Sequence, residues 1–214
     1  MEQGSETSLK TYECPPTCYC SHGKADTEAI IVDCSNKGLT RIPKLPPHAT
    51  QVYLQGNSIS SVPCSSLERL KFLEILDLSR NTLDSLAGCS FSTLASLQRL
   101  RLSLCNLTSL PAGVFDSLQS LIDLDLSLNN ISHIERGLFA HTAKLKTLNL
   151  YGNALTKLGN GTFAGLDSLN FLTLQSNKFR YLPVTFEPEA FFGLDALETY
   201  SWQPARFSCQ LYLP

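Results

Sequence analysis

The chain has 214 residues, of which 43% are hydrophobic, and a formal net charge of −2 at pH 7. This length and apolar content suffice for a large core in one elongated domain, and the nearly balanced charge gives no reason to expect a nucleic acid or an acidic membrane surface as partner. No apolar run approaches the roughly 18 residues that a membrane span needs.

Residues 1–12 are polar and without periodicity, so we predict a disordered tail. They contain no apolar signal core, yet the chain has eight cysteines, four of which lie between Cys14 and Cys34. Such cysteine usage indicates an oxidising compartment. We therefore expect a mature extracellular domain, or a fragment of one, whose signal sequence lies outside this chain.

Residues 13–48 are predicted to form a cysteine-rich terminal unit. The segment reads C-P-P-T-C-Y-C, and Cys34 follows in I-I-V-D-C-S-N. Four cysteines allow three pairings, which spacing alone does not distinguish. A zinc site that includes His22 is the alternative, although tetrahedral zinc sites usually combine two well-spaced pairs of ligands.

Residues 49–196 carry a repeated pattern. The stretch from Leu121 reads L-I-D-L-D-L-S-L-N-N-I, which resembles the leucine-rich repeat signature L-x-x-L-x-L-x-x-N-x-L. Leu124 and Leu126 alternate with polar residues, which places leucines on one face of a short strand and polar groups on the other. A strand this short is unstable alone, so the pattern predicts a solenoid of six stacked coils. The six copies begin at Ala49, Leu73, Leu97, Leu121, Leu145 and Leu169.

An asparagine ends each predicted strand where the backbone turns. The amide of Asn129, for example, can satisfy backbone groups of its own coil and of its neighbour. Cys105 occupies this position in the third coil. We predict a small buried thiol there, free and structural.

The return path of each coil is also periodic, and we predict two buried columns on it. Cys64 and Cys89 lie one coil apart, and a coil spacing of about 4.8 Å is compatible with a disulfide between them. The first column is a stacked aromatic spine with one leucine: Leu67, Phe91, Phe115, Phe139, Phe163 and Phe191. The second column is Val62, Leu86, Leu110, Ile134, Leu158 and Leu182.

The C-terminal end departs from the pattern. The sixth coil takes 28 residues, with an insertion around Pro183–Pro188; Phe186 and Phe192 in it pack internally or contact a partner. Residues 197–214 hold a degenerate last repeat. It ends in A-R-F-S-C, which resembles the N-P-W/F-x-C opening of a C-terminal cysteine cap. That cap is truncated, or else the aromatic residues Tyr200, Trp202 and Phe207 form a lid, and Cys209 has no obvious partner in the chain.

The strands are predicted to line the inside of an arc, so that their outward side chains form a concave face. Charges alternate in sign between neighbouring strands there, at Asp77, Arg101 and Asp125. Each exposed pair contributes under about 1 kcal/mol, so the arginines neutralise the acids, bind an anionic or hydrogen-bonding ligand, or do both. Exposed apolar side chains (Ile75, Leu104, Leu128, Phe171) favour binding. The candidate ligand-binding residues are Tyr53, Asp77, Arg80, Arg99, Arg101, Asp123, Asp125, Asn149, Tyr151 and Phe171.

We find no sequence motif for catalysis, for a metal or for a cofactor, and we predict that the protein is not an enzyme. The four histidines fall in the cap or on return loops, where we expect exposed spectators. Three tripeptides match the N-glycosylation signal. Asn160, in N-G-T on a loop, is the best acceptor, whereas we expect partial occlusion of Asn106 and Asn130.

The cysteine-rich segment resembles the N-terminal cap of extracellular leucine-rich repeat proteins. That resemblance implies the pairs Cys14–Cys20 and Cys18–Cys34. Across residues 14–209, coils of 24 residues and the motif L-P-A-G-V-F-D-S-L-Q-S-L resemble variable lymphocyte receptors of jawless vertebrates, their lancelet relatives and, more loosely, Toll-like receptor ectodomains. The implied fold is an α/β leucine-rich repeat solenoid with a curved parallel β-sheet on its concave face, a mostly irregular or 3-10 convex side and an N-terminal disulfide cap.

This resemblance implies a non-enzymatic recognition protein, secreted or on the extracellular face of the cell, of the innate-immune type. It would bind a pattern or an antigen on the concave face as a monomer or weak dimer. The expected ligand is a protein or a microbial surface glycan or lipid, with no cofactor and no nucleic acid. The alternative is an adhesion or matrix protein, or an ectodomain fragment of a larger signalling receptor.

Overall fold

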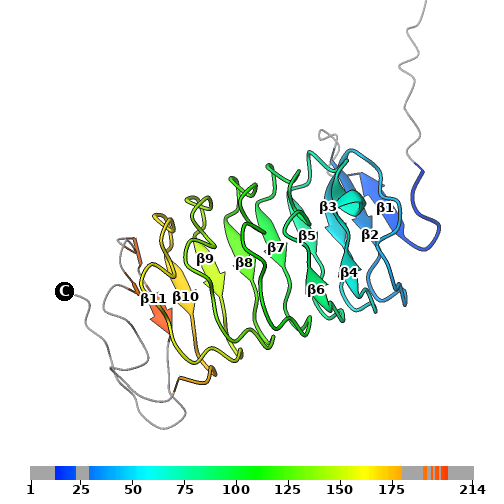
Figure 1. Ribbon diagram of the computed structural model, residues 1–214. Coiled ribbons are helices and arrows are strands. Elements are labelled where there is room, and N and C mark those ends of the chain that lie inside the picture. The colour runs from blue at the N-terminus through cyan, green and yellow to red at the C-terminus, as the bar shows by residue number, and fades with distance from the viewer. Residues whose placement is uncertain are drawn as a thin grey trace, which may run out of the picture.

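The structure is a computed structural model that describes residues 13–22, 29–179, 190, 191, 194, 196, 197 and 199–201, the last three and Ser85 by their backbone alone. Within these residues the chain winds into an elongated solenoid (Figure 1). The expected tail, the Pro183–Pro188 insertion with Leu182, Phe186 and Phe192, and the end with Trp202, Phe207 and Cys209 lie outside the described residues.

One sheet runs along the solenoid, with nine strands among the described residues. Only β1 and β2 pair antiparallel; every later pair is parallel. The register places Asp77 beside Arg101 and Arg101 beside Asp125, one coil apart. The strands follow in the order β1 (Tyr19–His22), β2 (Ile30–Asp33), β3 (Ala49–Tyr53), β5 (Ile75–Asp77), β7 (Arg99–Arg101), β8 (Asp123–Asp125), β9 (Thr147–Asn149), β10 (Phe171–Thr173) and β11 (Thr199–Ser201).

The return side carries little regular structure, as expected. Two short strands, β4 (Ser61–Val62) and β6 (Ser85–Leu86), pair in parallel there, and one helical turn, α1 (Cys64–Leu67), follows β4. The remaining return path consists of turns and irregular segments. The leucine-rich repeat solenoid predicted from the sequence is therefore confirmed.

The core consists of the predicted columns. The strand leucines, for example Leu100 and Leu124, are fully buried. The aromatic spine is confirmed: Phe115 and Phe139 stack with ring centroids 6.0 Å apart, and Phe163 packs on Phe191 at 5.8 Å. Within the second column Ile134 is only partly buried, although it packs against the core.

An asparagine ladder joins the coils. The Nδ2 group of Asn129 donates to Leu126 O of its own coil at 3.0 Å and to Leu102 O of the preceding coil at 2.8 Å. Its Oδ1 accepts the backbone N–H groups of Cys105 and Leu107, each at 3.0 Å. One buried side chain thus satisfies four backbone groups that would otherwise lose their hydrogen bonds to water. Equivalent bonds to two coils are made by Asn57, Asn81, Asn153 and Asn177.

Cys105 is the weak rung of this ladder. Its thiol donates to Leu78 O at 3.1 Å and so replaces one amide bond to the preceding coil. Sulfur is a poor hydrogen-bond acceptor. Cys105 therefore satisfies the backbone N–H groups of the second coil less well than an asparagine oxygen would. The thiol is free and buried, and burial raises the pKa of Cys105 to about 11. It therefore stays neutral and unreactive near pH 7.

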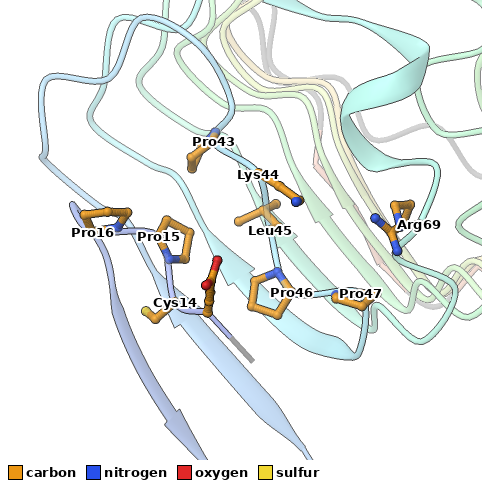
Figure 2. A pocket seen from close by; sticks show the side chains of 10 residues that line it. Cys14, Pro15, Pro16, Pro43, Lys44, Leu45, Pro46, Pro47 and Arg69 are labelled. Atoms are coloured by element: carbon orange, nitrogen blue, oxygen red, sulfur yellow. The ribbon is translucent and has the colours of Figure 1, made fainter. Parts of the chain in front are cut away.

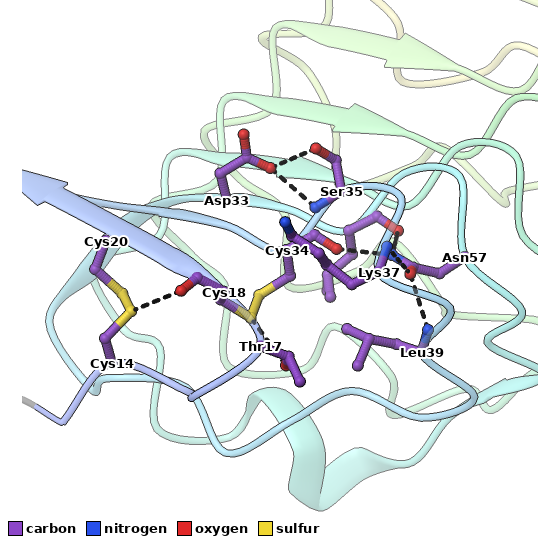
Figure 3. Close-up of a disulfide and its surroundings, with 11 residues drawn as sticks. Cys14, Thr17, Cys18, Cys20, Asp33, Cys34, Ser35, Lys37, Leu39 and Asn57 are labelled. Atoms are coloured by element: carbon purple, nitrogen blue, oxygen red, sulfur yellow. Dashed lines mark hydrogen bonds between the residues drawn. A yellow bond between two sulfur atoms is a disulfide. The ribbon is translucent and has the colours of Figure 1, made fainter.

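The N-terminal cap closes the first coil with two disulfides (Figure 3). They join Cys14 to Cys20 and Cys18 to Cys34, as the resemblance to cysteine caps implied. Asn57 extends the ladder into this cap, because its Oδ1 accepts the N–H groups of Lys37 and Leu39 at 2.9 Å. The cap therefore covers the open apolar edge that a first coil would otherwise expose.

A third disulfide joins Cys64, at the start of α1, to Cys89 in the next coil, with their Cα atoms 5.4 Å apart. The sequence separation is 25 residues. In the chain-entropy account, closing a loop of this size restricts the unfolded chain and stabilises the folded one by about 3 kcal/mol. The bridge also holds the return paths of the first two coils together.

Replacing ladder residues should change stability in opposite directions. We expect Asn129→Ala to lower the free energy of unfolding by about 3 kcal/mol, because it leaves buried backbone groups without partners. Cys105→Asn should raise it by about 1 kcal/mol, because the amide oxygen adds a good acceptor. Equilibrium denaturation measures both. The matched control is Asn130→Ala, an exposed neighbour; an equal loss there, or a loss for Cys105→Asn, contradicts the ladder account.

Candidate ligand-binding face

The predicted binding residues share the outward side of one sheet. Six strands contribute them, from Tyr53 on β3 to Phe171 on β10, while Arg80 and Tyr151 follow the ends of β5 and β9. With neighbouring strands about 4.8 Å apart, the row extends over about 24 Å. A row of this length suits a macromolecular contact rather than an enclosed small-molecule site.

The charged part of this face is largely self-neutralised. Arg99 Nε lies 3.3 Å from Asp123 Oδ2, and both side chains are partly exposed. Arg101 Nη1 lies 3.5 Å from Asp77 Oδ2, and the Asp77 side chain is only 9% exposed. Since both arginines are more than 40% exposed, water weakens these pairs to about 1 kcal/mol or less each. The ion pairs orient the arginines along the sheet rather than away from it.

The acids at the strand ends have a second task, which the sequence did not reveal. Oδ1 of Asp77 accepts the N–H of Ser79 at 2.9 Å, and Oδ1 of Asp125 accepts the N–H of Ser127 at 3.0 Å. Asn149 does the same for Tyr151 at 3.1 Å. Such turns satisfy the second backbone N–H after each strand, because the first, for example that of Leu78, already donates to the neighbouring strand. A residue used in this way has one oxygen fewer for a ligand.

The coils nearer the C-terminus present a different surface. Tyr151 is 37% exposed and Phe171 is 46% exposed, both large side chains on the outward side. Their neighbours on β9 and β10 are uncharged and partly exposed: Thr147, Asn149 and Thr173. The face therefore divides into a paired, charged part over β5, β7 and β8 and an uncharged aromatic part over β9 and β10.

The residue before each ladder position adopts a left-handed backbone. Glycine occupies it in two coils, at Gly56 and Gly152. Arg80, Leu104 and Leu128 hold the same position with φ between 54° and 55°. A non-glycine residue there costs roughly 1 kcal/mol. Leu104 and Leu128 are also 42% and 44% exposed, so neither burial nor backbone preference explains them.

Several expected positions differ from the sequence prediction. Ile75 is partly buried rather than exposed. The predicted occlusion of the acceptors at Asn106 and Asn130 is wrong, since both side chains are exposed and lie in contact at 3.4 Å. Tyr53 faces outward, and its hydroxyl donates to Gln51 Oε1 at 3.0 Å.

Within the part of the chain that the structure describes, no group of histidine, cysteine or acidic residues could hold a metal ion. His22, His48, His133 and His141 are all exposed. Among the same residues, no helix has the length and apolar content to cross a membrane.

A separate hollow of about 380 Å³ lies between the cap and the loop that precedes β3 (Figure 2). Prolines dominate its lining, and Lys44 and Arg69 stand at one side of it. None of its residues belongs to the sheet. Pro15-Pro16 and Pro46-Pro47 lie in two segments that only the fold brings together.

Family models match most of the chain. The model described as "Leucine rich repeat" matches residues 47–107, 95–155, 134–179 and 144–199, and the model described as "Leucine rich repeat N-terminal domain" matches residues 13–47. Together these matches run from the cap to β11.

Curated relatives align over shorter segments. Human platelet glycoprotein IX is 36% identical over 75 residues, 35% of this chain and 41% of that protein. Leucine-rich repeat-containing protein 3 of Danio rerio is 37% identical over 75 residues, 27% of its length. The insulin-like growth factor-binding protein complex acid labile subunit of Rattus norvegicus is 36% identical over 78 residues, 13% of its length. The chain thus matches less than half the length of each.

Two solved structures share the fold. The structure of TLR13 in a complex with ssRNA13 superposes with a TM-score of 0.66 at 30% identity, over 75% of this chain and 23% of that one. Human 5T4, a trophoblast glycoprotein, superposes with a TM-score of 0.58 at 24% identity, over 89% of this chain and 80% of that one. The second likeness concerns the fold alone.

Because Asp125 stabilises the turn through one oxygen, two substitutions of it should have different effects. Asp125→Asn keeps the oxygen that accepts the Ser127 N–H, as Asn149 does one coil later, so stability should change by less than about 0.5 kcal/mol. Asp125→Ala removes that acceptor and should cost about 1 kcal/mol. Denaturation midpoints of the two variants measure the difference. Equal losses would show that the charge, and not the turn, is what stabilises.

Proposed function

The chain belongs to the leucine-rich repeat family, and on that premise we propose that it is a non-enzymatic extracellular recognition protein that binds its ligand on the concave face. The observation that carries this proposal is the uncharged aromatic part of the face, with Tyr151 exposed just after β9 and Phe171 exposed on β10. Large rigid side chains exposed on a preorganised sheet lose little conformational freedom on binding and contribute strongly to affinity.

We assign the charged part of the face a supplementary role in ligand binding. Arg99 and Arg101 are already paired with acids, so a ligand must compete with those pairs or add to them. Asp77, Asp123, Asp125 and Asn149 then orient the arginines and the turns, while Tyr53 and Arg80 stand at the margin. This division favours a ligand that is neutral where it meets β9 and β10.

A protein or a microbial surface glycan or lipid fits these requirements. Aromatic rings flanked by hydroxyl and amide groups bind apolar protein side chains and the flat faces of sugars alike. The net charge of −2 does not favour a nucleic acid, although the TLR13 structure is a complex with RNA. We propose a monomer or weak dimer.

The three disulfides and the N-terminal cap support an extracellular location. The relatives named above include a platelet glycoprotein and a trophoblast glycoprotein. Pattern or antigen binding in innate immunity, as the resemblance to variable lymphocyte receptors implies, is the finer form of the proposal. The division into tail (1–12), cap (13–48), six repeats (49–196) and terminal segment (197–214) belongs to the same proposal.

The alternative is an adhesion or matrix protein, or an ectodomain fragment of a larger signalling receptor. The full-length transcript distinguishes the two: a downstream membrane span and cytoplasmic domain favour a receptor, and a stop codon after Pro214 favours a secreted protein.

A binding experiment tests the concave face directly. The purified chain is first screened against microbial polysaccharides, lipopolysaccharide and candidate self proteins. Against any ligand found, Tyr151→Ala with Arg101→Ala should weaken binding about tenfold or more, since each removes a contact group at the face, while the melting temperature changes little. Calorimetric titration measures the affinity.

The matched control for that experiment is Phe72→Ala. Phe72 is 56% exposed and stacks on His48, with ring centroids 5.6 Å apart, and neither residue belongs to a strand. Its loss should leave affinity unchanged. Affinity that survives Tyr151→Ala and Arg101→Ala, or that falls equally with Phe72→Ala, places the ligand elsewhere.

Three N-glycosylation acceptors complete the proposal. Asn106, Asn130 and Asn160 are all exposed, which supports them as acceptors. In protein secreted from animal cells, enzymatic release of N-glycans should reduce the apparent mass. The reduction should shrink stepwise with Thr108→Ala, Ser132→Ala and Thr162→Ala, which each remove one signal; an unchanged mass contradicts glycosylation.

A further inference from the structure

Three residues form a strip along the edge of the sheet where its strands end. Arg80, Leu104 and Leu128 follow β5, β7 and β8, which lie side by side in Figure 1. The backbone N–H of each residue donates to a carbonyl oxygen of the next coil. The acceptors are Ser103 O for Arg80, Ser127 O for Leu104 and Tyr151 O for Leu128, at 2.8, 3.1 and 2.7 Å. The strip therefore contains one residue from each of three successive coils.

The residues of this strip are exposed, and their left-handed backbone is one that residues other than glycine disfavour. Glycine holds the same position at Gly56 and Gly152, so the fold itself does not require a side chain there. The two leucines present a large apolar surface to water from a left-handed backbone. Leu128 also leans over Gly152, where a Cβ would come within 2.8 Å of its Cδ2, so the leucine packs along the edge rather than into the core.

A positive charge begins the strip. Among the described residues Arg80 takes part in none of the ion pairs, in contrast to Arg99 and Arg101. Its side chain is exposed. A partner that matches the strip therefore carries an acidic group at one end and two apolar groups after it.

We propose that this strip docks an amphipathic α-helix of a protein partner, with an acidic side chain at Arg80 and apolar side chains on Leu104 and Leu128. The spacing of the strip favours a helix. Arg80 and Leu128 lie two strand spacings apart, about 9.6 Å, and seven residues of an α-helix rise about 10.5 Å. One helical turn thus meets each coil.

Other peptide conformations fit the strip poorly. Side chains on one face of an extended strand repeat every 6.8 Å or so, and three of them span about 13.5 Å. A polyproline helix rises about 9.3 Å in three residues and so meets Arg80 and Leu128 but leaves Leu104 without a partner. The inference rests on the proposed function, because it names a partner class for a recognition protein, but it uses residues outside the pair that tests the concave face.

A synthetic helical peptide tests the proposal. The probe has about 16 residues, long enough to form a helix, with glutamate in its first turn, leucines four and seven positions later, and alanine and glutamine elsewhere. The probe is mixed with the chain as it is secreted and, in a second sample, with its Thr108→Ala, Ser132→Ala variant, so that obstruction by a glycan beside the strip is distinguished from a strip that does not bind. We expect saturable binding by fluorescence anisotropy and a gain in helical circular dichroism on mixing.

Variants of the strip give the expected changes. Leu104→Asn with Leu128→Asn should weaken binding about tenfold or more through lost apolar contact, and should preserve folding because asparagine tolerates a left-handed backbone. The matched control is Ile122→Asn, an apolar side chain of similar exposure, 38%, outside the strip. Arg80→Glu should weaken binding of the probe and restore it for a probe with lysine in place of the glutamate.

Altered peptides distinguish a docking strip from non-specific binding. A proline in the middle of the probe, or leucines moved around the helix, should abolish binding. Equal binding by the proline peptide, unchanged binding to the leucine variant, or no binding of the original probe overturns the proposal. If one of these results occurs while the ligand of the concave face still requires Tyr151, the docking strip is wrong and the proposed function stands.

Discussion

Each coil of this solenoid depends on its neighbours to bury its leucines and to satisfy its backbone at the turn. A single coil has one short strand, which cannot form a stable sheet or a core alone. Stacking buries both faces of every leucine layer, and the asparagine ladder supplies partners for the turn that follows each strand. Asn129 is an example, because its one side-chain amide forms hydrogen bonds with carbonyl groups and N–H groups of two coils.

That dependence also explains why the outward face is free to vary. The buried positions of a coil fix its strand and its turn, so the exposed positions on the strand can change without loss of the fold. Not every outward position is free, however. The acids at the ends of β5 and β8 stabilise the turns after them, and asparagine does the same after β9. What looks in sequence like a row of charges for a ligand is in part a row of turn-stabilising groups.

The positions that no structural task explains are therefore the informative ones. Tyr151 and Phe171 are large, exposed and without a task in the coil, and Leu104 and Leu128 combine exposure with an unfavourable backbone. Both sets lie on or beside the same sheet. A rigid face with an aromatic area over β9 and β10 and an apolar edge suits recognition of a macromolecule more than of a small molecule.

The sequence by itself determined the coil, its period and the face of every strand residue, because a spacing of 24 residues and the alternation of leucine with polar residues leave one way to bury the apolar side chains. It also located the ladder and the aromatic spine. Only the tertiary structure decided which outward residues remain available: Asp77 is buried against Arg101 and the Ser79 turn, Asn106 and Asn130 are exposed, and Arg80, Leu104 and Leu128 share a left-handed edge. These outcomes depend on contacts between coils and on backbone angles, which no pattern within one repeat records.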